Sequence, residues 1–99
     1  MIEIEEVKNT KQNISSFIKE TELINSNLSQ KLGLDLKLKL ELNQPIGAFK
    51  IRGAMNAVLN LSDQYKGVTC CSTGNHGKGV AFAAQKQNKK AVICMSENV

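Results

Sequence analysis

The most informative segment of this chain is Gln44-Pro45-Ile46-Gly47-Ala48-Phe49-Lys50-Ile51-Arg52-Gly53-Ala54. Its first half holds the only proline of the chain and a glycine close behind it, and this composition predicts a turn. From Lys50 onward, apolar residues recur every three or four positions, as they do along one face of a helix: Ile51, Ala54, Met55, Val58 and Leu61. Lys50 is therefore expected where a turn becomes a helix, directly after an aromatic residue.

A second informative segment, Cys71-Ser72-Thr73-Gly74-Asn75-His76-Gly77, follows about twenty residues later. The short apolar run 68–71 before it predicts a strand that is buried on both faces. Residues 72–75 form a polar loop, residues 76–87 read as a helix rich in small residues, and residues 91–95 read as another buried strand. This order of elements predicts a β-loop-α-β unit with parallel strands.

The N-terminal part contains two further patterns. Residues 3–20 predict an amphipathic helix, with acidic residues in its first turn. Residues 34–42 alternate strictly between leucine and a polar residue, which predicts a strand with one buried face.

Length and composition limit the class of protein. Ninety-nine residues suffice for one small domain, and the start of the chain is acidic with no continuous apolar run, so we expect no signal peptide, transmembrane span or membrane partner. Cys70, Cys71 and Cys94 are odd in number and lie in apolar runs. They predict reduced core cysteines in a cytoplasmic protein.

The net charge of +4 raises the possibility of nucleic-acid binding through Lys86, Lys89 and Lys90. No aromatic residue is interleaved with these lysines, so stacking on bases has no support. We interpret them as the solvated end of a helix and expect no nucleic-acid partner.

Two readings are open for each of the informative segments. Lys50 is either a solvated surface charge or a nucleophile, which requires a partly desolvated pocket such as Phe49 and the small neighbouring residues could form. The loop 72–75 either binds an anion at the carboxyl end of a strand or simply caps a helix through Asn75 or Thr73.

Residues 74–79 also invite comparison with nucleotide-binding motifs. They read Gly-Asn-His-Gly-Lys-Gly, which reverses the dinucleotide fingerprint and lacks the Ser or Thr of a P-loop. His76 is the only histidine and has no second metal ligand at usable spacing, so no metal site is expected.

Taken together, the two segments resemble the serine/threonine dehydratase branch of the fold-type II pyridoxal-phosphate (PLP) enzymes. Their order and spacing match, as does the preceding Leu38-Lys39-Leu40-Glu41, and the resemblance extends from about Thr21 onward. The ending Ile93-Cys94-Met95-Ser96 is similar to dehydratases associated with ectoine and hydroxyectoine utilisation. The implied fold is α/β and tryptophan synthase β-like, with an open parallel sheet and flanking helices, of which this chain is the N-terminal part.

The resemblance also implies roles for individual residues. Lys50 would be the catalytic lysine that bonds the cofactor pyridoxal 5′-phosphate, Phe49 would lie against the pyridine ring, and Asn75 would hydrogen-bond its 3′ oxygen. The substrate carboxylate would be surrounded by Ser72, Thr73, Gly74 and His76.

This chain departs from the family pattern at two positions, since Ile46 replaces a commoner threonine and Ala48 a commoner serine. Neither change removes a group that the chemistry requires. The resemblance implies that residues 1–62 begin the larger PLP domain and residues 63–99 the smaller β-α-β domain. The glycine-rich phosphate loop and the partner of the pyridine nitrogen would follow later, so residues 1–99 alone are expected to be inactive.

The implied activity is that of an ammonia-lyase, which converts a small β-hydroxy amino acid such as threonine or serine into a 2-oxo acid and ammonia. The longer enzyme would be a homo-oligomer. Two alternatives are open: an amino-acid racemase on the same scaffold, with Thr73 placed as a second acid/base, and a non-catalytic fragment that binds an anion.

Overall fold

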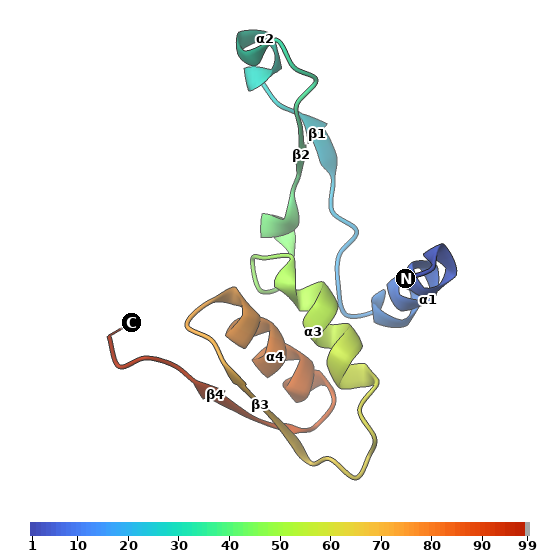
Figure 1. Cartoon of the computed structure of the whole chain (residues 1–99), viewed down its shortest axis with the longest axis vertical. Helices are drawn as coiled ribbons and strands as arrows, with labels where there is room; N and C mark the ends of the chain where they lie inside the picture. Colours follow the sequence, from blue (N-terminus) through green and yellow to red (C-terminus); the bar gives the residue numbers. More distant parts are fainter. Residues whose placement is uncertain (99) are drawn as a thin grey trace.

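The computed structural model describes residues 1–98 and contains two separate two-stranded sheets and four α-helices. Helix α4 lies between α3 and the parallel pair β3–β4, while the hairpin β1–β2 carries α2 at its tip and projects away from this body (Figure 1). The elements in chain order are α1 (Ile4–Ile14), β1 (Leu23–Asn25), α2 (Leu28–Leu32), β2 (Lys37–Lys39), the 3-10 turn η1 (Glu41–Asn43), α3 (Lys50–Leu59), β3 (Gly67–Cys71), α4 (Asn75–Lys86) and β4 (Lys90–Cys94).

The β-loop-α-β unit predicted from the sequence is confirmed. Strands β3 and β4 pair in parallel, with Gly67 opposite Lys90 and Cys71 opposite Cys94. The predicted burial of both strands is wrong for residues 1–98, because β3 alternates between exposed and half-buried positions and β4 is mostly exposed. The predicted core position of the cysteines is wrong for the same reason: all three thiols are free, but Cys71 and Cys94 are exposed and Cys70 is half-buried.

The core forms where α3 packs against α4. Ile51 and Met55 of α3 and Ala83 of α4 have no exposed surface, and Ile14 at the end of α1 closes the cluster from the other side of α3. The helical periodicity from Lys50 onward therefore identified the buried face of α3 correctly.

Two glycines of the Gly-x-x-Gly-x-Gly pattern serve close packing. A Cβ atom at Gly77 would lie 2.9 Å from Ile93 Cγ2 and 3.2 Å from the Ser72 carbonyl oxygen. A Cβ atom at Gly79 would lie 3.1 Å from Ala54 Cβ and 3.3 Å from the Lys50 carbonyl oxygen. These glycines thus let α4 approach β4 on one side and the first turns of α3 on the other.

The N-terminal helix is shorter than the predicted 3–20. Helix α1 begins with a capping box between Glu3 and Glu6 and ends at Ile14, after which the chain turns back so that the backbone of Lys19 can bond the side chain of Gln44. Phe17 and Ile18, which the pattern placed on the helix, instead pack against the core from the turns that follow.

The predicted strand at 34–42 is also wrong in length and burial. Only Lys37–Lys39 are strand, paired antiparallel with β1, and the chain then enters η1. Leu34, Leu38 and Leu42 are 63%, 43% and 69% exposed, because within residues 1–98 the hairpin projects from the core and nothing covers this face. The short elements β1 and α2 were not predicted.

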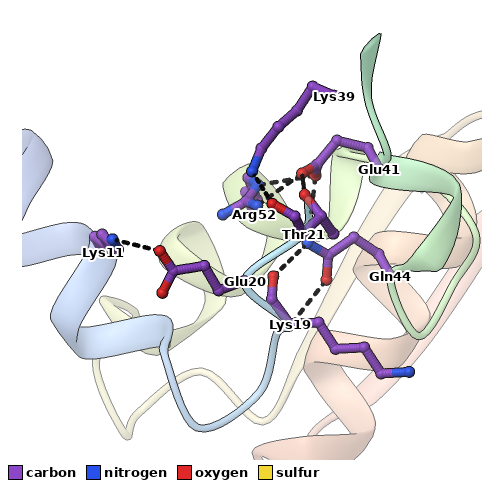
Figure 2. Close-up of polar contacts among 8 residues, drawn as sticks. All are labelled: Lys11, Lys19, Glu20, Thr21, Lys39, Glu41, Gln44 and Arg52. Carbon is purple, nitrogen blue, oxygen red and sulfur yellow. Dashed lines mark hydrogen bonds and ion pairs between the residues drawn. The ribbon is translucent and has the colours of Figure 1, made fainter. Parts of the chain in front are cut away.

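A polar cluster joins three separate parts of the chain, and Figure 2 shows its side chains converging on the carboxylate of Glu41. Arg52 donates two hydrogen bonds to Glu41, from Nε over 2.9 Å and from Nη2 over 2.7 Å. Thr21 Oγ1 and Gln44 Nε2 donate to the same carboxylate. We call Thr21, Glu41, Gln44 and Arg52 the Glu41 cluster.

The Glu41 cluster ties the N-terminal segment to η1 and α3. Gln44 is only 4% exposed, and its amide also accepts from Lys19 N over 2.9 Å and donates to Lys19 O over 2.8 Å. Hydrogen bonding from Arg52 is the main cause that lowers the pKa of Glu41 to about 2, against the opposing effect of desolvation.

Substituting Gly79 tests the helix contact, and Gly53 is a matched control because a Cβ there would meet nothing within 4 Å. Gly79→Ala should lower the free energy of unfolding, since overpacking costs about 1–3 kcal/mol and the gain in helix propensity is at most about 1 kcal/mol. Gly53→Ala should raise it by about 0.4–1 kcal/mol. Denaturant unfolding of both variants checks this; equal effects would contradict the close contact.

Substituting Glu41 tests the cluster through pH. Its pKa falls from 4.5 to about 2 on folding, so the stability it contributes is present above pH 4.5 and is lost as the pH falls through about 2. Glu41→Gln should therefore remove a loss of stability between about pH 4.5 and 2. Urea unfolding across this range measures the slope. Glu5→Gln, at an exposed pair with Lys8, should leave the slope unchanged.

Candidate active site

Lys50 is the first residue of α3, and the turn before it sets its position. Gly47 adopts a φ of +72°, a left-handed conformation that side chains other than glycine rarely adopt, and its N–H donates to Gln44 O over 2.8 Å. Phe49 precedes the helix with helical backbone angles. The prediction that Lys50 lies where a turn becomes a helix is confirmed.

The side chains of Lys50 and Phe49 lie against one another. Lys50 Nζ is 5.0 Å from the centroid of the Phe49 ring, within the range of a cation–π contact. Both side chains are exposed, Phe49 by 57%. The partly desolvated pocket expected around Lys50 is thus not formed by residues 1–98 themselves.

The loop at 72–74 leads from β3 into α4, and Ser72 caps the helix. Ser72 Oγ accepts hydrogen bonds from Gly74 N over 3.3 Å and from Gly77 N over 3.0 Å. The predicted caps, Asn75 and Thr73, make no side-chain capping bond, and Gly74 occupies the cap position. Because the hydroxyl oxygen of Ser72 is the acceptor, its O–H remains available as a donor.

The start of α4 presents free backbone donors. Within residues 1–98, no hydrogen-bond acceptor lies against the backbone N–H groups of Thr73, Asn75 and His76. Such N–H groups at a helix N-terminus attract anions, since the helix dipole adds to their partial positive charge.

Two hollows flank this loop. One of about 580 Å³ is lined in part by Phe49, Lys50 and His76, together with the strand residues Thr69 and Cys70. The other, about 470 Å³, is shallow and is lined by Cys71, Ser72, Thr73, Cys94, Met95 and Ser96. Phe49, Lys50 and His76 are therefore brought together, whereas Ser72 and Thr73 open onto the second hollow and Asn75 lines neither.

Sequence reasoning missed Thr69 as a residue of the first hollow. It lies within the run interpreted as a buried strand, and its hydroxyl was the only available signal. Residues 1–98 hold no group of three or more His, Cys, Asp or Glu side chains that could bind a metal ion. In the same range, no helix has the length and apolar character needed to cross a membrane.

Comparison with known proteins gives this geometry a context. Over 85 residues the chain is 47% identical to the biosynthetic L-threonine dehydratase of Staphylococcus epidermidis, covering 83% of this chain and 20% of that protein. The maize serine racemase structure matches with a TM-score of 0.89 and 34% identity, over 97% of this chain and 30% of the racemase. A solved threonine deaminase from the organism abbreviated T.th. matches with a TM-score of 0.83 and 36% identity, over 95% of this chain and 34% of the deaminase.

The chain thus spans about a fifth to a third of the length of these relatives. Its fold is the N-terminal part of the fold-type II architecture, as the resemblance implied. The family model described as "Pyridoxal-phosphate dependent enzyme" matches residues 14–99, which is most of the sequence. The chain belongs to the family of pyridoxal-phosphate dependent enzymes.

Proposed function

We propose that this chain is the part of a PLP-dependent ammonia-lyase that supplies the cofactor-bonding lysine and the loop for the substrate carboxylate. The observation that carries the proposal is the placement of Lys50, at the start of α3, beside the donor-rich start of α4, with Lys50 and His76 lining one hollow. A nucleophilic amine and an anion-binding loop are the two groups that an enzyme acting on an amino acid requires.

The names of the relatives favour threonine as the substrate. One relative is a threonine dehydratase and one solved structure a threonine deaminase, and each covers most of this chain. The proposed reaction removes water from a small β-hydroxy amino acid and then releases ammonia by hydrolysis, which leaves a 2-oxo acid. The division near residue 62, a homo-oligomeric state and a cytoplasmic location are parts of the same proposal.

The residues present fit the cofactor. Lys50 Nζ projects from the first turn of α3 beside a flat aromatic face, and the adjoining hollow of about 580 Å³ is large enough for a small planar ring. Lys50 and Phe49 would hold the ring, and Asn75, with its side chain at the start of α4, would be its hydrogen-bond partner. When bound, PLP supplies an electron sink for negative charge that develops at the substrate's α-carbon.

This chain's own residues would then do three things. The N–H groups of Thr73, Asn75 and His76 and the Ser72 and Thr73 hydroxyls would hold the substrate carboxylate, with Gly74 leaving the loop open to it. Lys50 Nζ would take the α-proton. The Phe49 ring would keep the amine on one face of the substrate and limit its contact with water.

A racemase is the second candidate, favoured by the TM-score of 0.89 to maize serine racemase. A racemase needs a second acid/base opposite Lys50, and the hydroxyl of Thr73 is the candidate group. Chiral chromatography of unreacted serine separates the two activities, because a lyase produces 2-oxo acid without D-serine.

The first functional prediction concerns Lys50. Borohydride reduction of the full-length protein with PLP, followed by peptide mapping, should place the pyridoxyl group on Lys50, and Lys50→Ala should abolish both the label and turnover. Lys86 is a matched control because its Nζ also lies over a phenylalanine ring, 5.4 Å from the centroid of Phe82. Lys86→Ala should change neither result; label on another lysine would refute the assignment.

The second functional prediction separates cofactor contacts from substrate contacts. Thr73→Val should raise KM for threonine about ten- to a hundredfold, since a hydrogen bond to a charged group contributes about 1.5–3 kcal/mol. The visible absorbance of the bound cofactor should stay unchanged. Asn75→Ala should shift this absorbance, because it removes the proposed partner of the ring oxygen. An unshifted spectrum in Asn75→Ala would contradict its role.

A further inference from the structure

The Glu41 cluster lies on the side of α3 that faces away from the candidate active site. Arg52 follows Lys50 by two residues, so the two side chains leave the helix about 200° apart. Figure 2 shows Arg52 directed toward Glu41, Thr21 and Gln44. Any rotation of the first turn of α3 that moved the Lys50 amine would therefore have to displace the Arg52 guanidinium from Glu41.

The cluster also holds the turn before Lys50 at its other end. Gln44 is fixed by its amide bonds to Lys19 and Glu41, and its carbonyl accepts from Gly47 N. Residues 45–51, which contain Phe49 and Lys50, are thus anchored on both sides by members of one cluster.

The chemistry of the pair suits a rigid anchor. Arg52 is the only arginine in a chain with twelve lysines, and its planar guanidinium makes two parallel bonds to Glu41 that a lysine cannot reproduce. Glu41 is 16% exposed and Arg52 34%, so water screens the pair only in part. Because its charge is already matched, Arg52 is not a free receptor for the substrate carboxylate.

We propose that Glu41 and Arg52 are positioning residues, which fix the rotation of the first turn of α3 and thereby the place of the Lys50 amine. This inference rests on the proposed role of Lys50 as the cofactor-bonding lysine. It assigns no contact between either residue and the cofactor or the substrate.

The test compares Glu41→Gln, Arg52→Lys, Arg52→Met and the double variant Glu41→Gln/Arg52→Met in the full-length protein. Glu5→Gln makes the same chemical change as Glu41→Gln, at an exposed pair 2.7 Å from Lys8, and is the control. Three quantities are measured: the rate at which added PLP becomes bonded to Lys50, the visible circular dichroism of the bound cofactor, and amide hydrogen exchange of a peptide spanning residues 49–53.

Glu41→Gln and Arg52→Met should each slow bonding about ten- to a hundredfold, reduce the dichroism and speed exchange at 49–53. The double variant should be no slower than the more affected single variant, since both remove one interaction. Arg52→Lys should recover part of the rate, and Glu5→Gln should match the unsubstituted protein.

Unchanged bonding, dichroism and exchange in Glu41→Gln and Arg52→Met would overturn the positioning role while leaving the proposed function intact. A raised KM for threonine with unchanged bonding would also overturn it, because Arg52 would then contact the substrate. If the unsubstituted protein formed no bond between PLP and Lys50, the proposed function would fail and the positioning of that amine would fail with it.

Discussion

The close approach of α4 to α3 at Gly79 is the contact on which the rest of the structure depends. With only a hydrogen in place of a side chain, α4 can lie against Ala54 and the carbonyl oxygen of Lys50. This approach buries Ile51, Met55 and Ala83 in one core, and it places the start of α4 beside the start of α3. The packing that stabilises the fold is therefore the same packing that assembles the candidate site.

Gly77 extends this arrangement to the sheet. It lets the first turn of α4 contact Ile93 of β4, while Ser72 caps that turn from the end of β3. The loop between strand and helix is thus held from both sides, and its remaining backbone donors point away from secondary structure. A loop held in this way can bind an anion without first being ordered, which reduces the entropic cost of binding.

The active-site elements could be read from the sequence because each depends on local chemistry. The period of apolar residues from Lys50 predicted α3, and the glycine-bearing polar loop predicted the start of α4. The resemblance to fold-type II enzymes then identified Lys50 and residues 72–76 together. The leucine alternation at 34–42 misled because a period of two reports which side chains share a face, whereas burial depends on what covers that face.

The sequence by itself therefore determined the family, the order of α3, β3, α4 and β4, and the residues that can carry chemistry. Only the tertiary structure decided that Ser72 caps α4, that Ser72 and Lys50 open onto different hollows, and that Arg52 is bound to Glu41. These features join residues that are distant in the chain or depend on the direction of a single hydrogen bond. Such relations arise from packing in three dimensions, and a local pattern of residue types does not encode them.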